Sequence, residues 1–210
     1  GAIEHVEIDP ATGGIIFQTI SGAIPLGICG SGVIDCIAKM LDAGILDKKG
    51  LFIGNVSQPG VRPSRDGGWE ICIAKRLMDN EDIVLTQKDV GEFQIAKAAV
   101  RAGISVLMEK AEVNVPQIDR ILISGSFGSH INPQSALLIG ILPEVPVHRI
   151  EAIGNAALEG AKMALISGRV RNLAHRIAEK VEYVELADSE TFQKRFIEAI
   201  SFPVKRDDSL

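Results

Sequence analysis

The chain has 210 residues, of which 46% are apolar and only 4% aromatic, and its formal charge at pH 7 is −5. This length suits one large domain or two small ones, with a true hydrophobic core filled by aliphatic side chains rather than aromatic rings. The negative charge excludes nucleic acid as the main partner, because binding to a phosphate backbone needs a concentrated basic surface.

The first predicted elements are a β-hairpin and a helix. Apolar residues nearly alternate over 3–20 on either side of the turn sequence Asp-Pro-Ala-Thr-Gly-Gly at 9–14, which is typical of two antiparallel strands. A glycine-rich turn follows at 27–32, and from there apolar residues recur at helical spacing until Gly44. This turn therefore leads directly into a helix.

The middle of the chain begins with a predicted loop. Residues 54–68 are rich in Gly, Pro, Ser and Arg, and we predict a surface loop in which Arg62 and Arg65 are solvated. Two short strands are predicted next, at 69–74 and 83–85, because apolar residues gather there on either side of a polar corner.

A long helix is predicted over 87–111. Thr86 and Asp89 supply the hydroxyl and the carboxylate of a capping box at its start. Five apolar residues at spacings of three, seven, four and three predict its buried face: Val90, Phe93, Val100, Ile104 and Leu107. Gln94 and Lys97 stand three residues apart on another face, where they either form a solvated polar surface or point together at one ligand.

The stretch 121–129, Ile-Leu-Ile-Ser-Gly-Ser-Phe-Gly-Ser, is the most informative in the chain, because an apolar strand pattern ends there on small residues. Gly125 and Gly128 would let the backbone approach a ligand closely, and serine hydroxyls stand beside them. The alternative is a tight strand-to-helix turn without a ligand.

Two other glycine turns stand in equivalent places along the chain. Gly154 and Asn155 follow a predicted strand over 148–153, and the turn at 27–32 precedes a helix. Ligands of open α/β sheets bind beyond the carboxyl ends of the strands. The three turns therefore predict one shared cleft.

The remaining segments predict three helices, one strand and a frayed tail. Asn132 and Pro133 suit the N-cap and first turn of a helix that runs to Gly140. The others are a helix over 155–167 with Leu158, Ala161 and Leu165 inward and Gly168 as its stop, a strand over 181–186, a helix over 189–200 with Phe192, Phe196 and Ile200 buried, and a frayed tail over 204–210.

The cysteines and histidines give no sign of a metal site. The three cysteines lack the short paired spacing that holds zinc or an iron–sulfur cluster, and we interpret Cys29, Cys36 and Cys72 as buried free thiols in a reducing compartment. The four histidines lack the helical spacing of metal ligands. No signal peptide and no apolar run of membrane-spanning length is present, so we expect a cytoplasmic protein without a membrane partner.

Several motifs occur together in a specific order: Gly-Ile-Cys-Gly-Ser-Gly-Val-Ile-Asp at 27–35, Thr-Gln-Lys-Asp-Val at 86–90, Ile-Ser-Gly-Ser-Phe-Gly at 123–128, Ile-Gly-Ile-Leu-Pro at 139–143 and Gly-Asn-Ala-Ala-Leu-Glu-Gly-Ala at 154–161. Through them, residues 1–168 resemble the reductive activators of corrinoid proteins, which are ATPases of the superfamily of acetate and sugar kinases, heat-shock chaperones and actin. The resemblance implies an α/β fold over 1–203, a ribonuclease-H-like half of an actin-like (ASKHA) ATPase with a mixed sheet and flanking helices.

The resemblance also implies the residues that bind a nucleotide. They are Gly125, Ser126, Phe127 and Gly128 beside adenosine, Gln94 and Lys97 beside ribose and purine, Gly30, Ser31 and Gly32 toward phosphates, and Gly154 in the adjoining turn. For the turn at 30–32 the alternative is packing against the hinge. No catalytic residue is assigned; Asp35 either touches magnesium through water or stabilises the helix dipole.

The implied activity is ATP-dependent return of inactive cob(II)alamin to cob(I)alamin on a corrinoid protein of a methyltransferase system. The cofactors would be ATP and Mg²⁺, with an iron–sulfur cluster in another domain, and the partner a corrinoid protein; a homodimer is left open. We expect this chain to be the carboxyl-terminal part, inactive alone. The alternatives are half of a sugar or metabolite kinase, and a nucleotide-gated interaction module without turnover.

Overall fold

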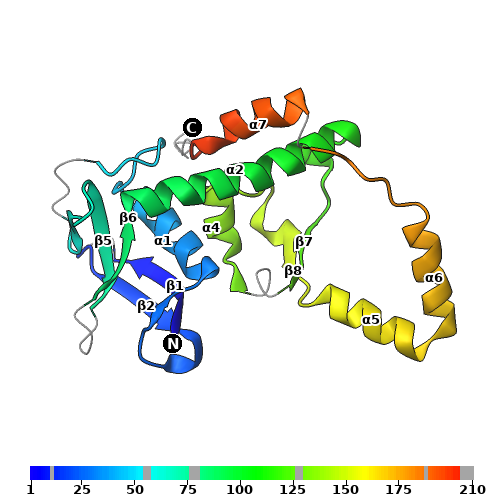
Figure 1. Ribbon diagram of the computed structural model, residues 1–210, viewed down its shortest axis with the longest axis horizontal. Helices are drawn as coiled ribbons and strands as arrows, with labels where there is room; N and C mark the ends of the chain where they lie inside the picture. Colours follow the sequence, from blue (N-terminus) through cyan, green and yellow to red (C-terminus); the bar gives the residue numbers. More distant parts are fainter. Residues whose placement is uncertain (10–11, 54–57, 76–80, 126–129, 187–188, 204–210) are drawn as a thin grey trace.

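The amino-terminal part of the chain is a small mixed sheet with a helix packed on it. The computed structural model describes residues 1–9, 12–53, 58–75, 81–125, 130–186 and 189–203. The first elements are β1 (Ala2–Ile8), β2 (Ile15–Thr19), β3 (Gly27–Ile28) and α1 (Gly30–Asp42). The middle strand β1 is antiparallel to β2 and parallel to β3, and α1 packs on it (Figure 1). The predicted hairpin and helix are confirmed.

The alternation of β1 and the periodicity of α1 bring two apolar faces together. Ile3 and Val6 of β1 are completely buried and belong to the same core cluster as Ile34 and Ile37 of α1. Burial of each such side chain stabilises the fold by about 1.5–3 kcal/mol. The core is largely aliphatic, in line with the composition.

The second sheet corrects the predicted loop over 54–68. Its strands are β4 (Val61–Pro63), β5 (Trp69–Ala74) and β6 (Ile83–Thr86), and β5 pairs antiparallel with both neighbours. Because β4 pairs with β5, Arg62 lies near acidic side chains rather than only in water. Its guanidinium lies 2.8 Å from Glu70 Oε1 and 2.9 Å from Asp82 Oδ2.

The helix α2 (Gln87–Lys110) begins at the predicted capping box. The Thr86 amide donates to Asp89 Oδ2 at 2.8 Å, and the Asp89 amide donates to Thr86 Oγ1 at 3.2 Å. Each side chain thus satisfies a backbone donor that the first helical turn leaves open.

The buried face of α2 is only partly the predicted one: Val90 is buried and Phe93 packs against the core, as expected. Val100 and Leu107 are 48% and 51% exposed, whereas the buried residues are Val90, Gln94, Lys97, Ala98, Ala102 and Val106. The predicted face was based on the positions of large apolar side chains in the sequence. The prediction failed because short alanines allow close packing and because two long polar side chains find partners in a segment about 100 residues further along the chain.

The third sheet contains the strand that ends at the glycine turn. It consists of β7 (Ile121–Ile123) and β8 (Ile150–Ala152), which are parallel, with α4 (Pro133–Leu138) between them in sequence. The predicted cap is confirmed, since Asn132 Oδ1 accepts from the Gln134 amide at 2.9 Å. The strand predicted over 148–153 starts later, because Val147–Arg149 forms a 3₁₀ turn.

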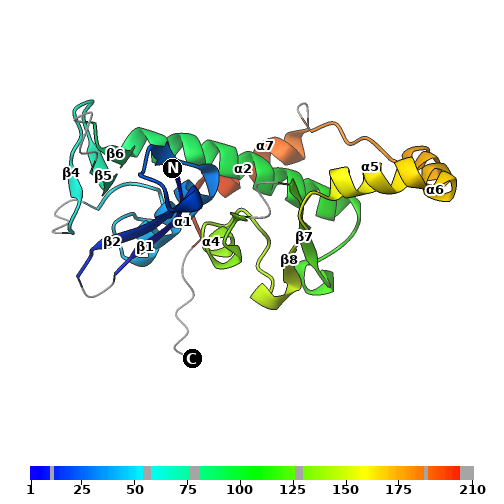
Figure 2. The ribbon, with the colours of Figure 1, turned by 90° about the horizontal axis from the view of Figure 1, so that it is seen from below.

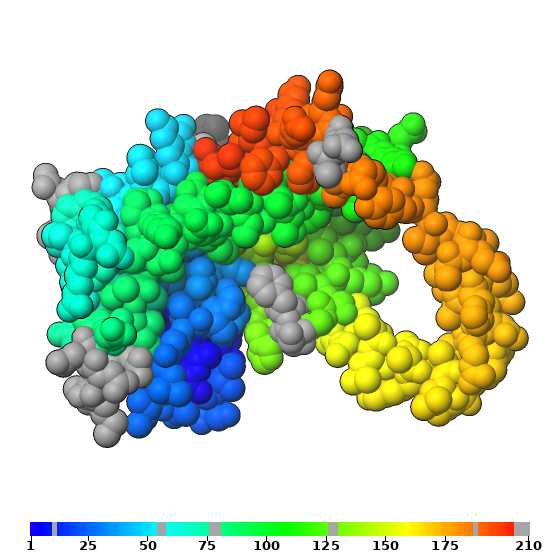
Figure 3. All heavy atoms as spheres, viewed as in Figure 1, coloured from blue at the N-terminus to red at the C-terminus, as the bar shows by residue number. Residues whose placement is uncertain are grey.

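Two helices project from the body of the molecule as an arm, α5 (Ala156–Ile166) and α6 (Gly168–Ala178) (Figure 3). Neither buries a residue in the described structure, so the prediction that Leu158 and Leu165 point inward is wrong; they are 49% and 77% exposed. The sequence prediction also missed α6. Ser167 accepts from the Val170 amide and caps this helix, so Gly168 opens a helix immediately after the first one stops.

The last helix, α7 (Glu190–Ile200), lies along α2 in both ribbon views (Figures 1 and 2). It confirms the predicted helix, although Phe192 and Phe196 are only half-buried, with ring centroids 6.1 Å apart. The strand predicted over 181–186 is wrong. That segment pairs with no other strand in the described part of the chain, and the frayed tail predicted over 204–210 lies outside it.

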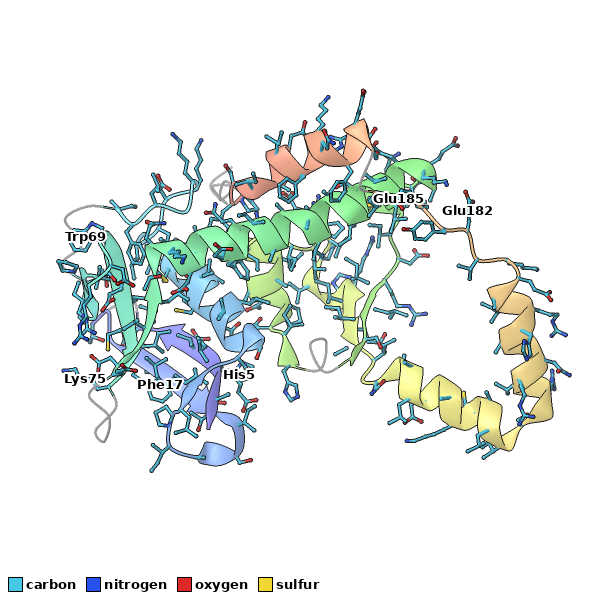
Figure 4. All side chains as sticks on the ribbon, in the orientation of Figure 1. His5, Phe17, Trp69, Lys75, Glu182 and Glu185 are labelled. Atoms are coloured by element: carbon cyan, nitrogen blue, oxygen red, sulfur yellow. The ribbon has the colours of Figure 1, made fainter. Side chains whose placement is uncertain are left out.

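Side-chain contacts hold the segment between the arm and α7. Glu182 Oε1 lies 2.5 Å from Lys110 Nζ at the end of α2, and the Tyr183 hydroxyl donates to Glu185 (Figure 4).

The described helices include none with both the length and the apolar character that a membrane span requires.

Candidate functional site

Two of the three predicted glycine turns meet directly. Because β7 and β8 are parallel, with Ile123 opposite Ala152, their carboxyl ends lie side by side. The Gly125 amide donates to the Gly154 carbonyl oxygen at 2.8 Å. The Ser124 side chain makes two further hydrogen bonds at this junction. Its hydroxyl donates to the Gly154 carbonyl oxygen at 3.1 Å and accepts from the Ala156 amide at 3.1 Å.

Both glycines of this junction have a backbone that requires glycine, and both face open space. Their φ angles are +87° at Gly125 and +64° at Gly154, in the left-handed region that other residues rarely adopt. No described heavy atom lies within 4 Å of the position that a Cβ would take at either residue. The junction therefore leaves room for a ligand against the backbone. The other predicted adenosine contacts, Ser126, Phe127 and Gly128, lie outside the described residues.

The segment 126–129 is bounded by contacts to two different sheets. On one side Gly125 bonds to the end of β8, and on the other His130 Nδ1 lies 3.7 Å from Glu4 Oε2 of β1. The described residues on either side of 126–129 thus contact the third sheet and the first one.

The third glycine turn is used for packing. A Cβ on Gly32 would lie 2.3 Å from the carbonyl oxygen of Ile3, so only glycine lets α1 approach β1 this closely. Ser31 is 5% exposed, with its hydroxyl 3.2 Å from Cys29 Sγ, and only Gly30 is exposed. The burial of Ser31 and Gly32 corrects the prediction that they face phosphates, and the turn packs on β1 and β3.

Gln94 and Lys97 also differ from their predicted role. Gln94 Nε2 donates to the carbonyl oxygens of Ile200 at 3.0 Å and Lys49 at 3.2 Å, and Lys97 Nζ donates to Ser201 O at 2.8 Å. Burial, and then the charge of Arg101, lower the Lys97 pKa to about 8. These donors hold the carboxyl end of α7, which corrects their prediction as contacts of ribose and purine.

Asp35 has a partner that the sequence did not reveal. Its Oδ2 lies 3.0 Å from Nδ1 of His5, which Figure 4 labels, while its Oδ1 is buried without a hydrogen-bond partner among the residues described. Asp35 is the sixth residue of α1, beyond the first turn, so the predicted effect on the helix dipole is corrected as well. The two residues are 30 positions apart, and no local pattern signals their pairing.

The cysteines are free, as predicted, although only Cys36 is fully buried. Burial, reinforced by the charge of Asp35, raises the Cys36 pKa to about 12, so this thiol stays protonated at neutral pH. Within the described ranges, no three His, Cys, Asp or Glu side chains are grouped to hold a metal ion.

Asn155 is a further residue that shapes the junction. Its Oδ1 accepts from the Leu158 amide at 3.0 Å and caps α5, so the Gly154 turn leads into a helix amino terminus. The dipeptide Gly-Asn before a helical pattern is the sequence signal for this arrangement.

The comparisons with known proteins agree on one family. A family model described as the C-terminal domain of RACo, the ASKHA domain, matches residues 1–210. The corrinoid activation enzyme RamQ of Eubacterium limosum is 32% identical over 94% of this chain, and the [Co(II) methylated amine-specific corrinoid protein] reductase of Methanosarcina barkeri is 25% identical over 93%. The chain covers 34% and 32% of these relatives, so it spans about a third of their length.

A solved structure is similar over nearly the whole chain. It is a reductive activator for corrinoid,iron-sulfur protein, with a TM-score of 0.87 and 36% identity over 97% of this chain and 32% of its own. At this level of similarity the predicted α/β, actin-like fold is confirmed.

Proposed function

Because the chain belongs to the family of C-terminal ASKHA domains of RACo, we propose that it is the nucleotide-binding part of an ATP-dependent reductive activator. The whole protein would return cob(II)alamin to cob(I)alamin on a corrinoid protein of a methyltransferase system. The three similar proteins are corrinoid activators or reductases by name, which favours this function over a metabolite kinase.

The observation that carries the nucleotide assignment is the junction of Gly125 and Gly154. Both turns have positive φ angles, open space on the Cβ side and a direct hydrogen bond between them. The flat adenine ring of adenosine can lie against backbone where no side chain intervenes. The described residues do not fit a Mg²⁺ site, because Asp35, the carboxylate expected to contact the ion through water, is buried and already paired with His5. We therefore assign only the nucleoside side of ATP to this chain.

Coupling between the nucleotide and the corrinoid partner would be conformational. A nucleotide that binds one arrangement of the activator more tightly than another shifts the population toward it, and the partner then meets a different surface. The residues of this chain would bind and orient the nucleoside. They would not carry the electron, since the Cys36 thiol stays protonated and the cysteines form no cluster site in the described structure.

Calorimetric titration of ATP and of ADP into the full chain tests the assignment. Gly125→Val should weaken the affinity at least about tenfold, because side-chain atoms would fill the open face of the junction; tenfold corresponds to about 1.4 kcal/mol. Gly67→Val is the matched control. Its φ of +90° and its open surroundings equal those of Gly125, and it lies in the second sheet region, away from the junction. Equal affinities of the two variants would overturn the assignment.

Binding of the corrinoid protein separates the activator from its alternatives. The protein should bind a corrinoid partner in the Co(II) state, with an affinity that changes when ATP is added. A metabolite kinase would show no such binding, and an interaction module without turnover would show binding without ATP hydrolysis in the whole protein.

A further inference from the structure

A pocket between α2 and α7 lies apart from the glycine junction. Its volume is about 310 Å³, and its lining includes Lys97, Arg101 and Ser105 of α2 and Arg195 and Glu198 of α7. The two helices lie side by side (Figure 1). Pro203 and Gly140 also line the pocket, and they pack so tightly that a Cβ on Gly140 would lie 2.6 Å from the Pro203 ring.

Arg101 brings an unused donor to this pocket. Its Nη1 is buried and has no hydrogen-bond partner among the described residues. Burial lowers the Arg101 pKa and the charge of Glu144 opposes that shift, but a guanidinium stays protonated at any physiological pH. Arg101 therefore brings a permanent cation to the pocket lining, together with one buried N–H group that no described residue satisfies.

Lys97 adds a second buried cation one helical turn away. It stands four residues before Arg101 on the same face of α2, and its Nζ lies 4.9 Å from the centre of the Phe202 ring. The repulsion between the two cations contributes to the lowered pKa of Lys97. A bound anion would relieve this repulsion.

The carboxylate at the mouth of the pocket does not neutralise these cations. Glu198 Oε2 lies 3.0 Å from Arg195 Nη1, and Arg195 also pairs with Glu109. Arg195 therefore holds both acidic side chains. The described lining thus has three cationic side chains, Lys97, Arg101 and Arg195, and one carboxylate, which is paired with Arg195, while Glu144 outside the lining acts on Arg101.

We propose that this pocket binds a small oxyanion, a phosphate or a carboxylate group, with Arg101 as its donor and Lys97 as a second positive charge. The planar guanidinium of arginine suits such groups, because two parallel N–H donors match two oxygens. The site is distinct from the proposed nucleotide site, since its described lining shares no residue with the junction of Gly125 and Gly154.

Thermal unfolding of the full chain tests the proposal. Inorganic phosphate or acetate replaces chloride at constant ionic strength, and the midpoint Tm is measured. At about 100 times the Kd, the bound anion should raise Tm by roughly 5–10 °C. A response to phosphate alone assigns a phosphate group, and a response to acetate as well assigns a carboxylate. Absence of any shift beyond that of chloride overturns the proposal.

Three variants make the test specific. Arg101→Met should abolish the shift, while Arg169→Met, which removes an exposed charge on α6, should retain it. In chloride alone Arg101→Met should unfold at the same or a higher temperature, because it removes an unsatisfied buried donor. An equal shift in Arg101→Met, or a large fall of its Tm in chloride, contradicts the proposal. Gly125→Val should keep the phosphate response, so failure of the nucleotide assignment is distinguishable from failure of this one.

Discussion

The ring of His5 on β1 lies 3.0 Å from the carboxylate of Asp35 on α1, and this pair joins the first sheet to the helix that covers it. Asp35 is 2% exposed and its other oxygen has no partner among the described residues, so His5 supplies the one hydrogen bond that its carboxylate makes there. Removal of the ring would leave the whole buried carboxylate unsatisfied.

The pair predicts the outcome of a double-mutant cycle. His5→Ala should lower the free energy of unfolding by about 1–3 kcal/mol, because a buried acceptor loses its partner. The double variant His5→Ala/Asp35→Ala should recover part of this loss, since no charge is then left buried. Urea unfolding of His5→Ala, Asp35→Ala and the double variant, each compared with the wild type, measures the coupling. A His5→Ala change within about 0.5 kcal/mol, the range of ordinary surface substitutions, would contradict the role of the pair.

Lys97 predicts a pH dependence of stability with a definite sign. The Lys97 pKa is about 8 in the folded chain, whereas its ordinary value is 10.5. Between pH 8 and pH 10.5 the unfolded chain therefore binds more protons than the folded chain. The free energy of unfolding of the wild type should therefore rise between pH 8 and 10.5 relative to Lys97→Met, by an amount on the order of 1–3 kcal/mol. Urea unfolding at several pH values gives the difference. Parallel pH profiles of the two proteins would show that Lys97 is not a buried ammonium.

Gln94 predicts a loss of stability without a loss of nucleotide affinity. Gln94→Met keeps the length of the side chain but removes the amide that bonds to Ile200 O and Lys49 O, and we expect a cost of about 1–3 kcal/mol. Urea unfolding measures the cost, and calorimetric titration of ATP measures the affinity. A large drop in affinity at unchanged stability would restore the ligand role that the family resemblance implied.

Gly32 predicts that a single methyl group is enough to disturb the first sheet. Gly32→Ala would place Cβ 2.3 Å from the Ile3 carbonyl oxygen, and we expect destabilisation of about 1–3 kcal/mol from this overpacking. Gly91→Ala is the control, because no atom lies within 4 Å of that position inside α2. It should stabilise the chain by about 0.5–1 kcal/mol. The same sign for both variants in urea unfolding would refute the packing role of Gly32.

Local patterns predicted the parts of the fold that depend on neighbouring residues. The Thr86–Asp89 capping box, the Asn132 cap and the first hairpin all follow from chemistry within a few positions, and all are confirmed. The glycines at 125 and 154 were likewise found from sequence, because positive φ angles demand glycine. The hydrogen bond that joins them could not be predicted from sequence, since it depends on the pairing of β7 with β8.

Most of the failures involve partners that are distant in sequence, and the one at Gly168 involves a local helix cap. The buried face of α2 was mispredicted because α7 supplies carbonyl acceptors for Gln94 and Lys97. Residues 181–186 have a sequence typical of a strand, but no neighbouring strand pairs with them in the described structure. Gly168 was taken for a helix stop, whereas Ser167 caps a new helix there. Propensity is a weak guide wherever tertiary contacts decide the outcome.

The arm formed by α5 and α6 has its own consequence for hydrogen exchange. Because the arm buries no side chain in the described structure, its amides are protected only by the local helical hydrogen bonds. Deuterium should therefore enter 156–178 well before it enters α1 or the centre of α2. Any surface that covers the arm would slow this uptake. Hydrogen exchange measured by mass spectrometry would therefore detect a partner that binds the arm.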